Sequence, residues 1–182
     1  MSNQMYAKGR EAFLEGSIAG LSDTLACSLV SSSYTVNLST DQFYNVISGG
    51  AIIAGPVSLT SVTGSAGTLS AANTVFSSVS GSAASFIVLF KNTGTSSTSA
   101  LLVYYDTATG LPVTPNGGNI TIAWASGVVF TLCESLAARE QEKHVRARWR
   151  ELLKELKKRW GVDKWGKSEG GLWIPQPSIV MA

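Results

Sequence analysis

Side chains of the kinds that catalyse reactions are few in this chain and widely spaced. The single histidine, His144, lies among Glu142, Lys143 and Arg146, and any Ser-His-Asp or Cys-His arrangement would have to use it. Serine is abundant, but "TGSAG" lacks the G-x-S-x-G spacing of a nucleophile elbow. The stretches "SGSAAS" and "GTLSAAN" are not phosphate loops, because no G-K-[ST] follows them. We therefore predict no catalytic residue and no bound cofactor, and we expect His144 to lie on the surface of a helix.

The acidic residues and cysteines do not indicate a metal site either. Glu11 and Glu15 are spaced to share one face of a helix, where a solvated pair is expected, and hydrolysis by paired carboxylates needs two acids that converge on a cleft. Cys27 and Cys133 both lie in apolar runs, which is typical of buried thiols. Two cysteines without partners do not make a structural zinc site, which needs four ligands. Whether these two cysteines pair stays open.

Charge is distributed unevenly along the 182 residues. Residues 1–133 contain three basic and five acidic residues, a net charge of −2, whereas residues 134–182 contain eleven basic and seven acidic residues, a net charge of +4. Such a division predicts two surfaces with different partners. The weakly charged body has little repulsion to keep copies apart, which suits a subunit packed in an assembly. Compositional drift in an ordinary β domain is the alternative.

No targeting or membrane-spanning signal is evident. The N-terminal stretch "MSNQMYAKGREAFLEG" carries charges where a secretory signal has its apolar core. No uninterrupted apolar run approaches the length needed to cross a bilayer. We expect a soluble protein, with no membrane partner, that folds in a reducing cytoplasm.

Residues 1–133 are predicted to form one mainly β body, an antiparallel β-sandwich or barrel. Apolar residues at helical spacing predict a short helix over 5–16. "STDQFYNVISG" is expected to make one helical turn, with Thr40 as its N-cap and Phe43 and Val46 facing inward. Short apolar or alternating pieces follow, separated by Gly, Ser, Asn and Pro. The most apolar of them, "SFIVLF" and "LLVYY", should lie at the centre of a sheet.

The C-terminal part is predicted to be an amphipathic α-helix over 134–161 followed by an extended arm over 162–182. The helix sequence has no Pro or Gly before Gly161 and consists largely of strong helix formers. Nine apolar or aromatic residues are predicted to form a protein interface: Val145, Trp149, Leu152, Leu153, Leu156, Trp160, Trp165, Trp173 and Ile174. Five basic residues are candidates for electrostatic contacts: Arg146, Arg150, Lys154, Lys157 and Lys158.

Nucleic acid, a membrane surface and another protein are the possible partners of this C-terminal part. A basic helix with tryptophans can lie on nucleic acid, but Glu140, Glu142, Glu151 and Glu155 would repel phosphates. A membrane-surface helix is less favoured again. Tryptophan and arginine dominate protein–protein hot spots, so a protein partner is favoured. The arm either clasps a neighbour or folds back on its own body, and the sequence leaves both open.

Several motifs of the body are arranged in a familiar order. Residues 3–132 contain "NQMYAKGREAFLEGSIAGLSDTLACSLV", "SYTVNLSTDQFYNVI", "VLFKNTG", "DTATGLPVTPNGGNITIAW" and "FTL". Together these resemble a family of small virion proteins encoded in the structural modules of tailed bacteriophages. The resemblance implies a β-rich structural protein, often a head decoration or fibre protein, and it transfers no catalytic residue. The family usually ends soon after the last strand, so residues 134–182 are not covered.

The expected function is that of a non-enzymatic virion protein, most simply a capsid decoration or cement protein. Its helix and arm would bind the major capsid protein, other virion proteins or neighbouring copies in a homo-oligomer. It would be present in the virion, and in the host cytoplasm during assembly. A head–tail connector or tail structural protein is the first alternative, and a DNA-contacting protein inside the head is the second.

Overall fold

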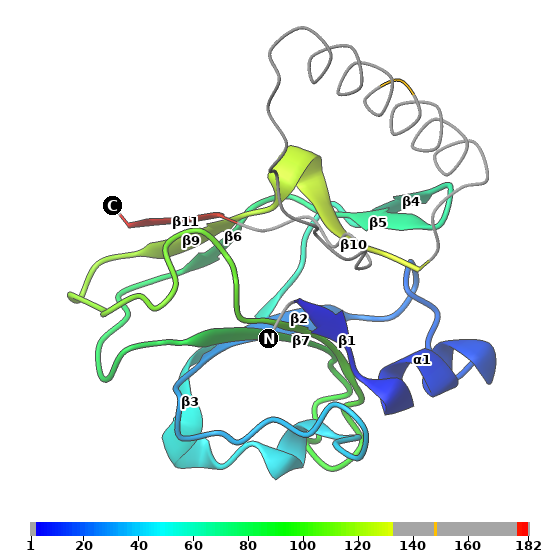
Figure 1. The fold of residues 1–182 in the computed structure, drawn as a ribbon, viewed down its shortest axis with the longest axis horizontal. Helices are drawn as coiled ribbons and strands as arrows, with labels where there is room; N and C mark the ends of the chain where they lie inside the picture. The colour runs from blue at the N-terminus through cyan, green and yellow to red at the C-terminus, as the bar shows by residue number, and fades with distance from the viewer. Residues whose placement is uncertain (1–2, 133–147, 149–177, 182) are drawn as a thin grey trace, which may run out of the picture.

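The computed structural model describes residues 3–132, residue 148 and residues 178–181. The strands form two layers, and helix α1 (Ala7–Leu14) lies at one end of the lower layer in Figure 1. The strands are β1 (Gln4–Met5), β2 (Leu25–Val30), β3 (Ile52–Ser58), β4 (Thr63–Ser65), β5 (Thr68–Ser70), β6 (Thr74–Phe76), β7 (Phe86–Lys91), β8 (Leu101–Tyr105), β9 (Ile120–Ala123), β10 (Val128–Thr131) and β11 (Ser178–Met181). The prediction of a mainly β fold with antiparallel sheets and a short N-terminal helix is confirmed.

The lower layer is a five-stranded antiparallel sheet in the order β1-β8-β7-β2-β3. Its central strand, β7, comes from "SFIVLF", and the neighbouring β8 comes from "LLVYY", so the predicted position of these two pieces is confirmed. All residues of β2 and β8 are buried. Strands buried on both faces need continuous apolar sequence, which explains why these pieces lack polar alternation.

Side chains of the lower sheet alternate between two hydrophobic cores. Leu25, Cys27 and Leu29 of β2 face the core between the layers, and Ala26 and Val30 face a second core below the sheet. This division follows from the two-residue repeat of a strand, in which successive side chains point to opposite faces. The sheet is therefore closed on both sides by the protein's own chain.

Residues 31–51 cover the lower face of this sheet, with Tyr44 and Ile47 buried against it. The ring of Tyr44 stacks on that of Phe90, with 4.1 Å between the ring centres. The Tyr44 hydroxyl also shares a hydrogen bond of 2.8 Å with the hydroxyl of Ser28. A stacked aromatic pair and a satisfied buried hydroxyl fix the position of a segment that has little regular structure of its own.

The predicted helical turn in this segment is wrong in detail. A 3₁₀ turn spans Tyr44–Val46, and Phe43, which precedes it, is extended, so Thr40 is not the N-cap. Val46 is 44% exposed, while Tyr44 and Ile47 are the buried pair. A 3₁₀ turn has three residues per turn, which brings residues three apart onto the same side. The inward-facing pair is therefore displaced by one position from the predicted one.

Helix α1 is shorter than predicted, because Met5 belongs to β1 and the helix begins at Ala7. It lies against β8 at Gly9, where an added Cβ atom would be 2.4 Å from the carbonyl oxygen of Leu101. Only a glycine allows this approach of the helix to the sheet backbone. After the helix, Gly16 has a φ of +72°, consistent with its predicted role as the stop signal.

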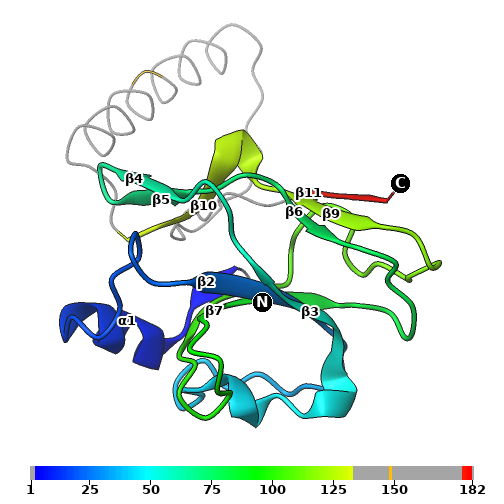
Figure 2. The same ribbon diagram turned by 180° about the vertical axis from the view of Figure 1, so that it is seen from behind.

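The upper layer consists of two three-stranded antiparallel sheets, β10-β5-β4 and β11-β9-β6 (Figures 1 and 2). The core between the layers holds Tyr105 of the lower sheet against Trp124, with ring centres 5.8 Å apart. The Tyr105 hydroxyl donates a 2.5 Å hydrogen bond to the carbonyl oxygen of Val129 in β10. This bond ties the two layers together inside the core, where an unsatisfied hydroxyl would be costly.

Little of the C-terminal part falls among the described residues. Arg148 is helical and exposed, and Ser178–Met181 form β11, which pairs with β9 of the same chain. These four residues therefore fold back on their own body, one of the two arrangements left open for the arm. Apart from Arg148, the predicted helix over 134–161 lies outside the described residues, as does most of the arm. No helix in the described parts of the chain is long and apolar enough to cross a bilayer.

Candidate functional site

The acidic side chains of the body occupy separate places in the fold. Glu11 pairs with Lys8 at 2.6 Å on the exposed face of α1. Among the described residues, no third acidic, histidine or cysteine side chain joins Glu11 and Glu15 to form a metal site. Asp23 forms an ion pair of 2.9 Å with Lys91 at the end of β7. Across residues 3–132 no group of three histidine, cysteine, aspartate or glutamate residues is placed to hold a metal ion.

Asp41 takes part in a short chain of buried hydroxyl groups. Its carboxylate accepts hydrogen bonds from the Tyr34 hydroxyl at 2.6 Å and from the Asn37 backbone amide at 2.8 Å. The Tyr34 hydroxyl lies 3.2 Å from that of Tyr6. Burial raises the pKa of both tyrosines, so both stay neutral at physiological pH. The arrangement joins residues 31–51 to the start of α1 and offers no phenolate for catalysis.

Cys27 is fully buried in β2. Burial raises the pKa of its thiol to about 12, so almost none of it is thiolate at neutral pH. The thiolate is the nucleophilic and metal-binding form of cysteine, and the prediction of a structural buried thiol fits this environment. Cys133 lies outside the described residues, and the pairing of the two cysteines stays untested.

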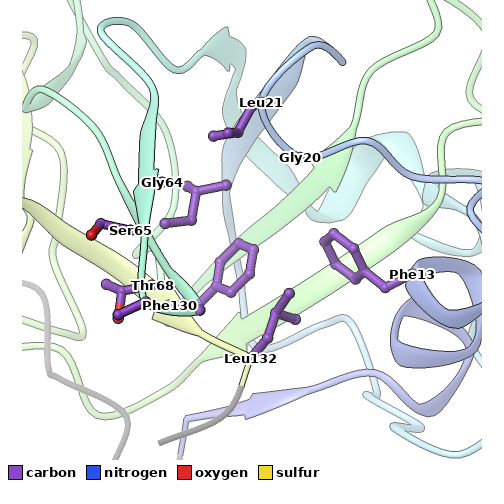
Figure 3. Close-up of a pocket in the computed structure, with 11 residues that line it drawn as sticks. Phe13, Gly20, Leu21, Gly64, Ser65, Thr68, Phe130 and Leu132 are labelled. Atoms are coloured by element: carbon purple, nitrogen blue, oxygen red, sulfur yellow. The ribbon is translucent and has the colours of Figure 1, made fainter. Parts of the chain in front are cut away.

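An open apolar groove lies at one end of the described body (Figure 3). It has a volume of about 340 Å³ and lies between the end of α1, the β4–β5 hairpin and the end of β10. Eleven residues line it: Phe13, Gly20, Leu21, Gly64, Ser65, Ala66, Gly67, Thr68, Leu69, Phe130 and Leu132. None of these residues carries a charge. Leu21 is 62% exposed and Leu132 is 49% exposed, so the groove presents apolar surface directly to solvent.

Local sequence explains how the walls of the groove form. The β4–β5 hairpin turns at Ala66 and Gly67, whose φ angles of +51° and +78° suit the tight turns of two-residue hairpins. The side chain of Leu21 lies over Gly64, where an added Cβ would be 3.0 Å from it. A glycine in the strand thus makes room for the leucine, and the hairpin forms one side of the groove.

The base of the groove is aromatic. The rings of Phe13 from α1 and Phe130 from β10 are inclined to each other, with 6.0 Å between their centres. Phe130 is buried and Phe13 is partly buried, so the pair joins the groove to the core between the layers. Tilted aromatic pairs at this distance are mutually stabilising, which gives the groove a firm base.

All of the predicted interface and electrostatic residues fall outside the part of the chain that the structure describes. The roles of Val145, Trp149 and the others, through Ile174, therefore stay predictions. The groove residues were missed because they come from four separate stretches of sequence. One available signal was Leu21, a large apolar residue in the polar stretch "GLSD". The groove ends at Leu132, where the C-terminal part of the chain begins.

The sequence matches no protein-family model, and it matches none of the curated proteins.

Proposed function

We propose that this chain is a non-enzymatic structural protein of a tailed-phage particle, and specifically a decoration or cement protein of the capsid. The observation that carries the proposal is the uncharged apolar groove that opens to solvent beside Leu132. Both faces of the lower sheet, by contrast, are covered by the chain itself. Solvent-exposed apolar surface of this kind is typical of contacts between proteins.

The resemblance to phage virion proteins supports the same proposal, because the motifs that carry it form strands and turns of the β body. "VLFKNTG" forms the end of β7, where Lys91 pairs with Asp23, and "PVTPNGGNITIAW" leads into β9. Within it Val113 exchanges two backbone hydrogen bonds with Ala84, and Gly117 adopts a φ of +87° before the strand. The motifs that resemble the phage family thus form parts of the sandwich. Residues 134–182, which the resemblance does not cover, would supply contacts specific to this chain.

The occupant we assign to the groove is an uncharged apolar segment of the major capsid protein. A lining without charged groups gives no compensation for a buried charge, so a charged ligand would lose hydration without gaining a partner. The groove also adjoins Leu132, where the predicted helix and arm leave the body. Contacts by the groove and by residues 134–182 can therefore reinforce each other on one neighbouring subunit.

Substitution of Leu21 tests the groove. Leu21→Glu should weaken binding of the purified protein to shells that lack it by about tenfold or more, because burying one leucine contributes about 1.5–3 kcal/mol and a buried carboxylate adds a penalty. Leu14→Glu is the matched control, since Leu14 is 90% exposed and lies outside the groove. Equal shell binding by both variants would remove the groove from the interface.

The copy number in purified virions tests the function itself. Quantitative mass spectrometry should give a number comparable to that of the major capsid protein. A second protease is needed, because trypsin has no site between Arg10 and Lys91 or between Lys91 and Arg139. A number on the order of a dozen would indicate the neck or tail instead, and absence from virions would refute the proposal. DNA binding that weakens steeply with salt would favour the second alternative, a protein inside the head.

A further inference from the structure

The C-terminal strand β11 completes a sheet to which residues 3–132 contribute two strands, β6 and β9. β11 pairs antiparallel with β9 over four positions, from Ser178 opposite Ala123 to Met181 opposite Ile120. On its other side β9 pairs with β6 over three positions. Without β11, therefore, β9 would be an edge strand. Figures 1 and 2 both show β11 lying alongside β9 at the rim of the upper layer.

An uncovered β9 would be a strong acceptor for another strand. Its Ile120 and Ile122 are buried in the core between the layers, so the strand is held firmly in place. Thr121 and Ala123 alternate with them and are only partly buried. A firmly held edge strand presents unpaired backbone amide and carbonyl groups that bind an added strand by main-chain hydrogen bonds.

The donor strand lies far from its acceptor along the sequence. The 45 residues from 133 to 177 separate β11 from the rest of the body. For two segments of one chain, the effective concentration of one at the other is about millimolar when a short flexible linker joins them, and it falls as the linker lengthens. Copies held side by side in an assembly reach comparable local concentrations. The backbone ladder that forms within a chain can form equally well between two chains, because both strands are identical.

We propose that β9 accepts Ser178–Met181 from a second copy of this chain, so that neighbouring subunits exchange C-terminal strands. This rests on the proposed function in one respect, since the packed shell supplies the local concentration. Exchange between identical strands creates a connection without any new type of contact, as in domain swapping. In dilute solution the strand returns to its own β9, which is the arrangement in the structure.

Split cysteine pairs test the proposal directly. Thr121 and Val180 lie opposite each other in the ladder. In a Cys133→Ser background, one chain carries Thr121→Cys and a second chain of different mass carries Val180→Cys, and the two are mixed and oxidised. Because the two cysteines are on different chains, a disulfide in excess of the out-of-register background forms by exchange. We expect this mixed disulfide to increase at least tenfold between micromolar and millimolar protein.

Matched controls define the alternative outcomes. Thr121→Cys mixed with Ser178→Cys should cross-link at least tenfold less, because these positions are two residues out of register. Ala123→Cys with Ser178→Cys is a second in-register pair. If both in-register double variants cross-link within one chain while their split mixtures never cross-link, exchange is refuted. If neither double variant cross-links, the β9–β11 pairing itself is refuted. Exchange in purified protein is independent of the virion copy number, so the two proposals fail separately.

Discussion

Replacing Gly9 by alanine should destabilise this protein, although Gly9 lies inside helix α1. In an isolated helix the change would be favourable by about 1 kcal/mol, because glycine is a poor helix former. Here the new Cβ would lie 2.4 Å from the Leu101 carbonyl oxygen and 3.1 Å from the Cα of Leu102. Both atoms belong to the backbone of β8, whose residues are all buried, so neither can move aside easily. Helix propensity therefore predicts that Gly9→Ala raises the free energy of unfolding, whereas packing predicts that it lowers it.

The cost of the steric contact with β8 should exceed the gain in helix propensity. Inserting a methyl group into a well-packed site costs about 1–3 kcal/mol, and this contact involves rigid backbone on the sheet side. The Cβ would lie only 2.4 Å from a backbone oxygen, so we expect a cost near the upper end of this range. After subtracting the propensity gain of about 1 kcal/mol, we expect the free energy of unfolding to fall by up to about 2 kcal/mol. Displacement of α1 would also move Phe13, which forms part of the base of the groove. A loss of shell binding should therefore accompany the loss of stability.

Urea unfolding, followed by tryptophan fluorescence and circular dichroism, measures the difference. Gly49→Ala is the matched control, because an added Cβ at Gly49 meets nothing within 4 Å. The control should stay within about 0.5 kcal/mol of the parent protein. If Gly9→Ala instead stabilises the protein by about 1 kcal/mol, the helix is not seated on β8 as described, and the explanation for a glycine at this position is wrong.

Two further predictions concern ionisable groups. Although partial burial opposes it, hydrogen bonds from the Lys91 ammonium and the Ala19 amide lower the pKa of Asp23 below its usual value. A carboxylate with a lowered native pKa stabilises the fold above its unfolded pKa and stops doing so as pH falls through the native pKa. The urea midpoint of Asp23→Asn should thus lie below that of the parent at pH 7 and converge with it towards pH 3; an unchanged difference would contradict this. In a Cys133→Ser variant, Cys27 should resist a thiol reagent at pH 8 until the protein unfolds, because burial raises its pKa to about 12; rapid labelling of the native protein would show that β2 is accessible.

Sequence reasoning succeeded where one strand carries its own signal. "SFIVLF" and "LLVYY" are continuous apolar runs, and strands covered on both faces need such runs, so their central position could be predicted. It was less accurate where a tertiary partner decides the local structure. Met5 falls within the predicted helix, yet it belongs to β1 and pairs with Val103 of β8. The spacing of apolar residues within a short stretch gives no information about a strand partner about a hundred residues away.

The groove could not be predicted for a related reason. Phe13, Leu21, Gly64 and Phe130 each have ordinary local roles, and they meet only because α1 and the β4–β5 hairpin lie at the same end of the sandwich. Leu14 illustrates the converse, since it is an apolar residue of the predicted helix but is 90% exposed. A helix of eight residues has too few turns for periodicity to identify its buried side accurately.

The position of the two proposed contact surfaces follows from how the sheets are closed. The lower sheet is covered on one side by residues 31–51 and on the other by the upper layer, so its faces are already buried. The groove at β10 and the acceptor strand β9 both involve the upper layer, and residues 133–177 leave beside the first and return to the second. The groove uses apolar side chains, whereas β9 uses backbone hydrogen bonds. Leu21→Glu should therefore impair shell binding without reducing strand exchange in purified protein, and a joint loss would mean that the two surfaces act as one.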